Sequence, residues 1–584
     1  MCGIAGISFS DRASSVLTSA LKSLEYRGYD SCGICVKNGK GLVVKKGIGD
    51  VGVVSKKEGF TSVEGFSGIA HTRWATHGGV TDFNAHPHLS CNNDFSLVHN
   101  GIIDNYLELK EELIEKGHFF RSQTDSEVIV HFLEEFCKNN DLLTSFKFVL
   151  QKIVGTYAFL AINSIDNSIV GAKNQSPLVI GKLKNGKGFF FASDILALKN
   201  DCEEVLFLDD EEFFFLSNSG QLSVFDKYHK PVIRDFLKID FDFEDVFLGE
   251  FKSFMEKEIF EQQKVLPNAL IQDNDSVIRF KKKLFESKKI FLVACGSSSY
   301  ATLLFKEFLL SKGVLANWVL GSEFEKYVNF LDKDSLVFMV SQSGETADLI
   351  THVKGIKQRG AFLSCLVNVK MSTLDRVSDL SFYVNAGTEV GVATTKALTN
   401  QFMFLKFLSN ELFDGNFLNF DKSLVGSVID HNMLLVKHLA KDLVFKKSVF
   451  FLGRGKGFAV AKEGALKLKE ISYLHAEGFE GGELKHGTLA LIEKGVPVVC
   501  INPEGEEYSE MISNIHEVKA RGGLIIGVSE KHSHLFDYWI RVPRSDFFEV
   551  LSVIPLQLLT LFTGYALGRN VDKPRNLAKS VTVR

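Results

Sequence analysis

An internal repeat in the second part of the chain constrains the fold more than any other feature. Apolar stretches at Ile290–Gly296 and Ser448–Gly455 each lead into a glycine turn and then into a segment with helical spacing. A Lys-x-Arg-Gly core at 357–360, and again at 519–522, precedes a further apolar stretch. Apolar strands that alternate with helices indicate parallel α/β units, whose ligands bind beyond the carboxyl ends of the strands. The repeat therefore predicts two α/β doubly wound domains of similar topology.

The two copies of the repeat differ in the turns after their strands. The first copy has serine-rich turns at Gly296–Ser299 and Ser341–Thr346, whereas the second has Asn502–Gly505 at the second of these places. Hydroxyl and backbone N–H groups at a helix start can hold a phosphate, while a proline and a glutamate disfavour one. We therefore predict a phosphate site in the first copy. Taken alone, each serine-rich turn is explained by helix capping.

The second copy carries titratable side chains instead. Glu463, Lys467 and Glu470 are spaced to share one helix face, just after the glycine turn where a ligand would bind. His486 is followed by glycine and could act as a general acid or base near neutral pH, and Lys579 lies in the C-terminal tail. The alternatives are a solvated ladder of salt bridges on the helix and an exposed lysine in the tail.

The first third of the chain, residues 1–220, has the pattern of short strands and turns with a few helices. Strands are predicted at Gly3–Ile7 and Ser31–Val36, where small and apolar residues alternate. Helical spacing predicts helices at Leu107–Lys116 and Ser126–Phe136, and Asp125 could cap the second helix.

Cys2 is a candidate nucleophile in this first third. If Met1 is removed, one residue carries both a thiol and an α-amino group, whose pKa of about 7.7–8.0 lets it act as the base. The Asn100 amide and the Gly101 N–H could hold an anionic oxygen, Arg73 could grip a carboxylate, and Asp125 could accept from an ammonium. Together these groups fit glutamine. Singly, they are equally a turn dipeptide and a surface ion pair.

Three further motifs are interpreted as structural. Cys32–Cys35 matches a C-x-x-C pattern but lacks a second pair, and as one strand it would send its thiols to different sides. Gly47–Gly52 matches G-x-G-x-x-G without a convincing βαβ unit, so we expect a hairpin turn. His86, His88 and Cys91 suggest a metal, but an intervening proline and the lack of a fourth partner favour a structural loop. We predict no metal site.

The first third resembles the class II (N-terminal nucleophile) glutamine amidotransferases. The resemblance rests on Cys2–Ile4, Tyr26–Ser31, His71–Gly78 and His99–Gly101. It implies a four-layer αββα glutaminase domain that releases ammonia from glutamine. It also implies the following roles: Cys2 as nucleophile, Asn100 and Gly101 as oxyanion hole, Arg73, Thr76, His77 and Asp125 around glutamine, and Trp74 as the gate for ammonia.

The remainder resembles the isomerase half of the glucosamine-6-phosphate synthase family, which has two sugar isomerase (SIS) domains. The matching runs are 341–346, 387–396, 452–455, 463–470, 482–487 and 575–583, and with the first third they cover nearly the whole chain in the family's order. Small departures are Thr488 and Gln263, where the family usually has proline. The resemblance implies an α+β N-terminal-nucleophile αββα glutaminase domain followed by two α/β doubly wound parallel-sheet domains.

The same resemblance implies roles in sugar chemistry. Lys579 would form an imine with the open-chain ketose, His486 from a second subunit would open the ring, and Glu470 would move a proton between C1 and C2, supported by Lys467 and Glu463. Fructose 6-phosphate would be bound by Cys295, Gly296, Ser297, Ser298, Ser341, Gln342, Ser343, Thr346, Val392 and Ala578.

The implied activity converts fructose 6-phosphate and glutamine into glucosamine 6-phosphate and glutamate, with ammonia passing through an internal channel and without metal or pyridoxal phosphate. We expect a homodimer. The expected divisions are a glutaminase domain at 1–222, a linker at 223–280, SIS domains at 281–420 and 421–574, and an active-site tail at 575–584.

Charge and hydropathy limit the partners and the cellular location that we expect. A net charge of −4 argues against a general nucleic-acid surface. The longest apolar candidate, Val550–Leu561, is interrupted by Pro555 and Gln557 and is too short for a membrane span. The N-terminus lacks the basic start and apolar run of a signal peptide. We therefore expect a cytoplasmic protein with reduced cysteines, bound neither to nucleic acid nor to a membrane.

Two alternatives remain. A different class II amidotransferase would make a phosphoribosylamine or asparagine, but neither an Asp-Asp phosphoribosyl-pyrophosphate loop nor a Ser-Gly-Gly-x-Asp-Ser ATP loop occurs. A non-catalytic regulator that binds sugar phosphates is the second alternative. Cys2, Glu470, His486 and Lys579, all present, argue against it.

Overall fold

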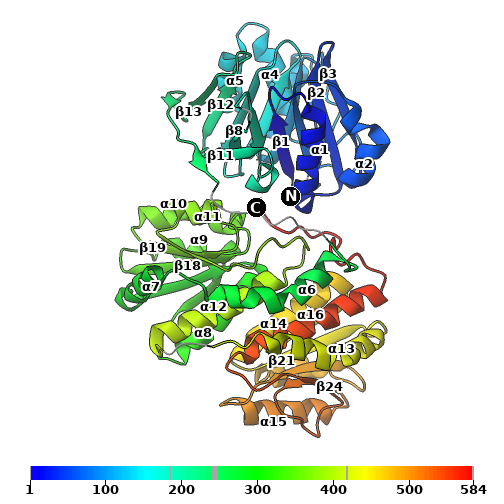
Figure 1. Ribbon diagram of the computed structural model, residues 1–584, viewed down its shortest axis with the longest axis vertical. Helices are drawn as coiled ribbons and strands as arrows, with labels where there is room; N and C mark the ends of the chain where they lie inside the picture. The colour runs from blue at the N-terminus through cyan, green and yellow to red at the C-terminus, as the bar shows by residue number, and fades with distance from the viewer. Residues whose placement is uncertain (1, 76, 185, 240–247, 416–418, 582–584) are drawn as a thin grey trace. The chain divides into compact units, whose positions relative to one another are not determined.

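The computed structural model describes residues 2–75, 77–184, 186–239, 248–415 and 419–581. The chain forms two compact units, Met1–Phe243 with Ser580–Arg584 (unit 1) and Glu244–Lys579 (unit 2). Each unit is described by itself (Figure 1). Thr76, expected beside glutamine, lies outside the described residues.

Unit 1 contains two antiparallel sheets. The first has eight described strands in the order β15-β11-β9-β10-β1-β4-β2-β3, and the second has seven in the order β14-β13-β12-β8-β7-β6-β5. The strands of the first sheet are β1 (Gly3–Ile7), β2 (Ser31–Asn38), β3 (Gly41–Ile48), β4 (Ser67–Arg73), β9 (Val179–Leu183), β10 (Phe189–Ala192), β11 (Cys202–Phe207) and β15 (Leu237–Lys238). Those of the second are β5 (His88–Leu89), β6 (Phe95–Ile103), β7 (Gly155–Asn163), β8 (Ile169–Asn174), β12 (Glu212–Leu216), β13 (Leu222–Phe225) and β14 (Pro231–Val232).

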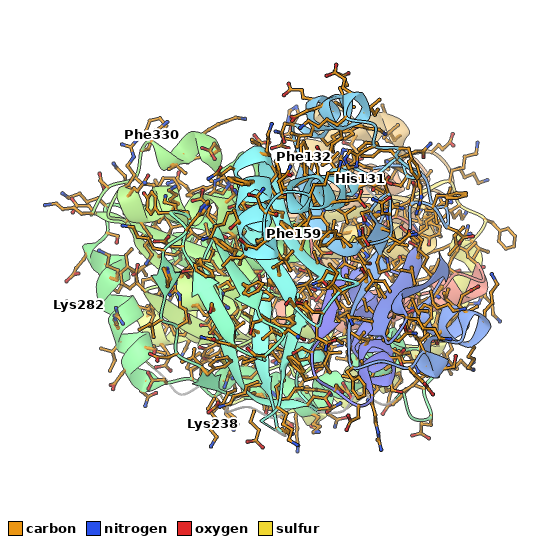
Figure 2. All side chains as sticks on the ribbon, turned by 90° about the horizontal axis from the view of Figure 1, so that it is seen from above. His131, Phe132, Phe159, Lys238, Lys282 and Phe330 are labelled. Carbon is orange, nitrogen blue, oxygen red and sulfur yellow. The ribbon has the colours of Figure 1, made fainter. Side chains whose placement is uncertain are left out.

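The two sheets pack face to face with helices outside them. Between the sheets lies an apolar layer that includes Phe191 of one sheet and Phe214 of the other, whose rings stack 4.5 Å apart. On the far side of the second sheet, Phe132 and Phe159, both labelled in Figure 2, belong to a second core. The helices are α1 (Ala13–Leu24) and α2 (Val51–Glu58) beside the first sheet, and α3 (Tyr106–Glu115), α4 (Glu127–Cys137) and α5 (Leu142–Lys152) beside the second. The predicted αββα layers are confirmed.

Local predictions in unit 1 hold with two corrections. The helix predicted from residue 126 is α4, but Asp125 does not cap it: its Oδ2 accepts from the Ile103 N–H at 2.8 Å. The hairpin turn expected at 47–52 is wrong, because β3 ends there and α2 begins, with the Asp50 carboxylate capping the helix. Cys32 and Cys35 both lie in β2 as buried free thiols, as the strand interpretation requires.

Unit 2 contains two parallel sheets with the same strand order, β17-β16-β18-β19-β20 and β22-β21-β23-β24-β25. This arrangement confirms two doubly wound domains of similar topology. The first sheet has β16 (Lys289–Ala294), β17 (Asn317–Leu320), β18 (Ser335–Ser341), β19 (Phe362–Val367) and β20 (Leu380–Tyr383). The second has β21 (Ser448–Gly453), β22 (His475–Glu480), β23 (Pro497–Asn502), β24 (Leu524–Ser529) and β25 (Tyr538–Arg541).

The strand order of unit 2 selects where ligands bind. In each sheet the strand order reverses between the first and third strands in chain order, and doubly wound folds bind ligands at that switch point. It lies between β16 and β18 in one copy and between β21 and β23 in the other. The helices are α6 (Phe254–Val265), α7 (Asn274–Glu286), α8 (Gly296–Leu310), α9 (Glu325–Val328), α10 (Ala347–Gln358), α11 (Thr373–Val377), α12 (Lys396–Phe413), α13 (Ser423–Leu443), α14 (Lys456–Ser472), α15 (Tyr508–Lys519) and α16 (Phe548–Ala566).

Helix α16 corrects the length expected for the longest apolar segment. Pro555 lies inside the helix, which runs for 19 residues and is long and apolar enough to cross a membrane by length and composition alone. However, 89% of its apolar window is buried inside the protein. Its side chains pack in the same core as those of α13 and α14, so it is the central helix of unit 2.

Candidate functional site

Cys2 lies immediately before β1, beside the end of β4. Its Sγ accepts from the Trp74 N–H at 3.3 Å and lies 3.5 Å from the Trp74 carbonyl oxygen. Burial raises the pKa of the Cys2 thiol. The thiol is therefore protonated at neutral pH, and a base must remove the proton before the sulfur can attack.

Asn100 faces Cys2 from β6. Its side-chain Nδ2 donates to the Cys2 carbonyl oxygen at 3.0 Å. His71 Nε2 contacts the His99 carbonyl oxygen at 3.0 Å and Asn100 Oδ1 at 3.1 Å. Because a carbonyl can only accept, this nitrogen carries the proton, and burial lowers the pKa of His71 to about 3. A neutral His71 thus orients the Asn100 amide, a role that the sequence analysis missed.

Gly101 is required by its surroundings. Its φ is +126°, and a Cβ added there would lie 2.0 Å from the Thr156 carbonyl oxygen. A side chain at this position would therefore meet both backbone strain and a steric clash. Only glycine lets the backbone after Asn100 follow this path.

Arg73 and Asp125 are both buried and are linked through Asn84. The Arg73 guanidinium donates to the carbonyl oxygens of His77 at 2.5 Å and Gly79 at 3.1 Å. Asn84 Nδ2 donates to the same Gly79 oxygen at 2.9 Å, and Asn84 Oδ1 accepts from the Gln123 N–H at 2.9 Å. The loop gripped by Arg73 and the loop that carries Asp125 are therefore held together.

The charged groups around the Cys2 thiol influence the pKa of Arg73. Burial lowers the pKa of Arg73, and Cys2, Asp30 and Asp125 oppose that shift. Asp30 Oδ2 accepts from the Ala75 N–H at 2.9 Å, which fixes the turn after β4. Two aromatic contacts flank this turn: Trp74 meets Tyr29 edge-on at 5.7 Å, and His77 meets Tyr106 at 5.8 Å.

In unit 2, both serine-rich turns lie at the switch point of the first SIS sheet. Gly296–Ser299 forms the first turn of α8, after β16. Ser341 ends β18, where its Oγ accepts from the Gly344 N–H at 3.0 Å and contacts Thr346 Oγ1 at 2.8 Å. Thr346 is the residue before α10. Two helix starts with hydroxyl side chains therefore meet at one sheet edge, which is suited to an anion.

The second SIS copy presents its titratable face on α14. Lys467 Nζ lies 2.5 Å from Glu470 Oε2 and 3.7 Å from Glu463 Oε1, and Glu463 and Lys467 are almost fully buried. Burial raises the pKa of Glu463 to about 8. The alternative of a solvated ladder of salt bridges is therefore excluded for Glu463 and Lys467. Tyr300 of α8 lies close enough that Glu463 and Glu470 help to raise its pKa to about 12, after burial, so α14 faces the first copy.

Lys579 has a partner that the sequence analysis did not single out. Its Nζ pairs with the Glu389 carboxylate, and both side chains are buried. Glu389 also accepts from the Thr395 N–H at 2.9 Å and the Ala397 N–H at 3.0 Å. Burial would raise the pKa of Glu389, but Lys579 and these amide donors lower it to about 2. Glu389 also affects the pKa of Lys467, which places the tail near α14.

The remaining predicted residues are less closely connected. Val392 donates its N–H to the Asp572 carbonyl oxygen at 3.0 Å, which joins its loop to the segment just before the tail, and Ala578 is half-buried. Gln342 accepts from the Asn368 N–H at 3.0 Å. His486 is exposed on a short turn after β22, and no side-chain hydrogen bond joins it to the other described residues.

The comparisons with known proteins agree in both units. Residues 71–200 match the glutamine amidotransferase domain family, and residues 283–410 and 442–561 match the SIS domain family. Over 100% of both chains, this chain is 41% identical to a protein of Thermococcus kodakarensis and 40% identical to one of Thermus thermophilus, both named glutamine–fructose-6-phosphate aminotransferase (isomerizing).

One solved structure extends the likeness to three dimensions. The C-terminal domain of glucosamine-fructose-6-phosphate aminotransferase from Francisella tularensis is 32% identical, covers 56% of this chain and 100% of its own, and superposes with a TM-score of 0.51. This chain therefore belongs to the family of isomerizing glutamine–fructose-6-phosphate aminotransferases.

Proposed function

We propose that two sites in this chain divide the reaction of its family, in which glutamine and fructose 6-phosphate become glutamate and glucosamine 6-phosphate. Unit 1 would release ammonia and unit 2 would add it to the sugar. One observation carries the proposal: a chain with Cys2 beside the Asn100 amide also buries Glu463, Lys467 and Lys579 in its parallel-sheet unit. We further propose that the protein acts as a cytoplasmic homodimer, with neither a nucleic-acid nor a membrane partner.

The first half-reaction is an attack on the side-chain amide of glutamine. The Cys2 α-amine, free after removal of Met1, takes the thiol proton, and the sulfur bonds to the amide carbon. The Asn100 Nδ2 and the Gly101 N–H stabilise the oxyanion. The C–N bond then breaks, and ammonia leaves with the transferred proton. Water hydrolyses the thioester to glutamate, while Arg73, Thr76, His77 and Asp125 hold the α-carboxylate and α-ammonium groups.

The second half-reaction takes place in unit 2. Ser341, Ser343 and Thr346, with the other residues of the two serine-rich turns, hold the phosphate of the sugar, and Val392 and Ala578 lie beside the carbon chain. We propose SIS parts at 281–420 and 421–574 and a tail at 575–584. The glutaminase part was expected at 1–222 and the linker at 223–280, but β14 and β15 belong to the sheets of unit 1, and α6 and α7 belong to unit 2. We therefore propose that the glutaminase part extends through β15 and that the linker is correspondingly shorter.

Lys579 would act as the imine-forming amine. Its ammonium is paired with Glu389, so it must give up a proton before its nitrogen can attack C2 of the open-chain ketose. Burial alone would raise the pKa of Glu389, so its carboxylate takes that proton only as the pairing with the Lys579 ammonium is lost. Ammonia then displaces Lys579 from the imine, which leaves nitrogen on C2 of the sugar.

Glu470 would complete the isomerisation. Lys467, 2.5 Å from its carboxylate, stabilises the ionised form that can accept a proton. Glu470 takes a proton from C1 and returns one to C2, so that the C2 imine becomes an amine and the C1 hydroxyl becomes an aldehyde. Glu463, whose raised pKa of about 8 keeps it protonated at neutral pH, adds no second negative charge beside Glu470.

Product analysis of four chains tests this division. Wild type should form glucosamine 6-phosphate from glutamine and fructose 6-phosphate. Cys2→Ala should lose that synthesis but still interconvert fructose 6-phosphate and glucose 6-phosphate, whereas Lys579→Ala should lose synthesis but still hydrolyse glutamine. Cys137→Ser, a thiol outside both sites, is the control and should keep both activities. Glutamine use by Cys2→Ala at the wild-type rate would show that Cys2 is not the nucleophile.

His486 is proposed to act across subunits, as a ring-opening group in the partner's site. Its exposure on the turn after β22 supports this role. Mixed dimers of His486→Ala and Lys579→Ala chains would then contain one intact site, and random mixing should restore about one quarter of wild-type synthesis. A mixture as inactive as its parents would place His486 in its own chain's site.

Trp74 is proposed to gate the passage of ammonia. Its contact with Cys2 through the backbone supports this placement. Trp74→Ala should hydrolyse glutamine while forming less than one glucosamine 6-phosphate per glutamate. A product ratio equal to that of wild type would exclude the gate.

A further inference from the structure

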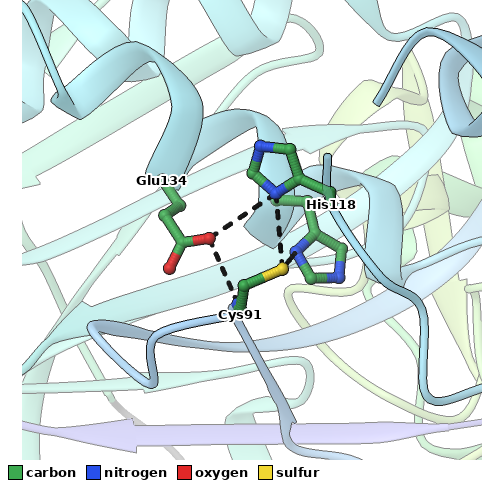
Figure 3. A group of neighbouring side chains, drawn as sticks. Cys91, His118 and Glu134 are labelled. Carbon is green, nitrogen blue, oxygen red and sulfur yellow. Dashed lines mark hydrogen bonds and ion pairs between the residues drawn. The ribbon is translucent and has the colours of Figure 1, made fainter. Parts of the chain in front are cut away.

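Four side chains of metal-binding type converge in unit 1, away from Cys2 in sequence. Cys91 lies in the turn between β5 and β6, His118 follows α3, and His131 and Glu134 project from α4. No two of their donor atoms are more than 4.8 Å apart. Figure 3 shows the Cys91 thiol, the His118 imidazole and the Glu134 carboxylate turned toward one another.

The spacing of the donors matches a tetrahedral ion. Cys91 Sγ lies 3.5 Å from Nδ1 of His118 and 3.5 Å from Nδ1 of His131. His118 Nδ1 lies 3.6 Å from Glu134 Oε2. Zinc bound at about 2.0–2.3 Å separates its ligands by roughly 3.3–3.7 Å. Three contacts of the cluster therefore already have the length of tetrahedral edges.

The cluster has too few protons for every close contact between its donor atoms to be a hydrogen bond. His118 Nε2 lies 3.1 Å from Glu135 Oε2, and His131 Nε2 lies 3.4 Å from Glu127 Oε1. Carboxylates accept hydrogen bonds, so each neutral imidazole carries its proton on Nε2 and presents the Nδ1 lone pair to Cys91. One thiol proton cannot satisfy two lone pairs. A cation can bind both nitrogens and the thiolate at once.

The outer partners complete a familiar arrangement of metal sites. A histidine ligand usually donates its other N–H to a carboxylate, which fixes the ring and its tautomer. Glu127 and Glu135 have this position here. Glu134 is oriented in turn, because its two oxygens accept from the N–H groups of Cys91 at 3.1 Å and Asn92 at 2.9 Å.

We propose that Cys91, His118, His131 and Glu134 bind a zinc ion. A thiolate and two imidazoles favour Zn²⁺ over Mg²⁺ or Ca²⁺, and four protein donors leave no open position, which is typical of a structural site. His118, His131 and Glu134 are 7%, 1% and 5% exposed, so these three donors are already desolvated, whereas Cys91 is half-buried.

The histidines that the sequence grouped with Cys91 belong elsewhere. His86 stacks on His71 at 4.2 Å and meets His88 at 4.3 Å. His118 and His131 supply the partners that the local pattern lacked. They follow Cys91 by a whole helix and more in the sequence, so no short spacing reveals the cluster.

The zinc site would stiffen the approach to Asp125. Glu127, the partner of His131, also accepts from the N–H groups of Arg121 at 2.8 Å and Ser122 at 2.7 Å. These residues begin the segment that ends at Asp125. Loss of zinc should therefore raise KM for glutamine more than it lowers kcat. This consequence rests on the proposed function, whereas metal binding itself does not.

Metal analysis of the full chain tests the site directly. Wild type, stripped by chelator and reconstituted with Zn²⁺, should retain about one zinc per chain after gel filtration. Cys137→Ser, a partly buried thiol on α4, should retain the same amount, and Cys91→Ser should lose at least tenfold in affinity. A wild-type chain without retained zinc, or a Cys91→Ser chain with undiminished zinc, would overturn the proposal.

Cobalt identifies the ligand without relying on the fold of a variant. Co²⁺ bound to wild type should give a thiolate-to-cobalt charge-transfer band and the strong visible absorption of a tetrahedral ion. Both should persist in Cys2→Ala, which separates the site from the N-terminal thiol. Absence of the thiolate band in wild type, or its loss in Cys2→Ala, would contradict the assignment. If the glutamine KM alone stayed unchanged on zinc removal, the link to Asp125 would fail while the site stood.

Discussion

The two SIS copies share a strand order but have divided the work of one fold. After the third strand of each copy in chain order, the first copy reads Ser341-Gln-Ser-Gly-Glu-Thr346 and the second reads Asn502-Pro-Glu-Gly-Glu-Glu507. The glycine is kept, Ser343 and Thr346 are replaced by Glu504 and Glu507, and Ser341 is replaced by Asn502. At Gly455, an added Cβ would lie 2.3 Å from Glu507 Oε1, so a carboxylate already lies near the start of α14. An incoming phosphate would meet a negative charge there.

The helices after the first strands show the reverse difference. Counted from Gly296 and Gly455, the positions of Glu463, Lys467 and Glu470 on α14 correspond to Leu304 and Phe308 on α8 and to Ser311 just after it. Leu304 and Phe308 are buried in the apolar core. Under the proposed function, one copy would use its helix for packing and its turns for binding, and the other would use its helix for chemistry. Duplication lets each task adopt the electrostatics that it needs.

The largest expected effect separates chemistry from binding. Glu470→Gln keeps the size of the side chain but removes the group that moves the proton, so synthesis should fall by about 10²–10⁴-fold with little change in KM for fructose 6-phosphate. Steady-state kinetics measure both constants. Ser311→Ala, at the equivalent place in the first copy, is the control. A fall in Ser311→Ala of similar size would remove the functional difference between the helices.

A smaller effect is expected in the serine-rich turn. Ser343→Ala removes one hydrogen bond to a charged phosphate, worth about 1.5–3 kcal/mol, so KM for fructose 6-phosphate should rise by roughly 10–100-fold while kcat stays close to wild type. The matched change in the second copy, Glu504→Ala, should leave KM unaltered. Equal effects of the two changes would show that both copies contact the sugar phosphate.

The buried acid of the second copy should also make stability depend on pH. Burial raises the pKa of Glu463 to about 8, above its value of roughly 4.3 in an unfolded chain. The folded state therefore binds the extra proton, and stability falls as the pH rises between about 4.3 and 8, by at most about 1.4 kcal/mol per pH unit.

Glu463→Gln cannot lose a proton, so its thermal midpoint should gain on that of wild type as the pH rises from 5 to 8. Differential scanning calorimetry at several pH values measures the difference. Glu286→Gln, which removes an exposed carboxylate at the end of α7, controls for charge. A Glu463→Gln difference that is constant with pH would argue against a protonated Glu463.

Local patterns predicted much of this fold because apolar strands, glycine turns and helix starts lie within short stretches. The apolar stretch that follows the Lys-x-Arg-Gly core at 357–360 is β19 (Phe362–Val367). The helix face of Glu463 and Glu470 followed from spacing. Local patterns do not reveal partners that meet only through tertiary packing. The pair of Lys579 and Glu389 joins residues 190 positions apart, and no periodicity links them.

The site in unit 1 shows the same limit. Asp125 was expected to cap a helix because acidic residues before helices often do so, but the Ile103 N–H of a neighbouring strand takes its carboxylate instead. His71 lies in the run His71–Gly78, which the sequence analysis used. Its hydrogen bond to the Asn100 amide nevertheless depends on how the two sheets pack against each other. Residue type drew attention to Asp125 and His71, but only the fold shows which hydrogen-bond partner each one has.

The smallest effect is expected when the turn of the second copy is given the sequence of the first. Asn502→Ser, Pro503→Gln, Glu504→Ser and Glu507→Thr together give the second copy the turn of the first and remove the carboxylate near Gly455. The backbone N–H groups at the start of α14 would then be open to an anion. A site with a Kd near 10 mM for inorganic phosphate stabilises the folded state by only about 0.4 kcal/mol at 10 mM, so a thermal midpoint shift of roughly 1 °C is expected. The thermal midpoints with and without phosphate are compared in chains that carry Ser343→Ala, so that the first copy contributes little.

A grafted chain whose thermal midpoint shows no added response to phosphate would show that the turn alone does not decide which copy binds the anion. The packing beneath α14 would then also exclude it.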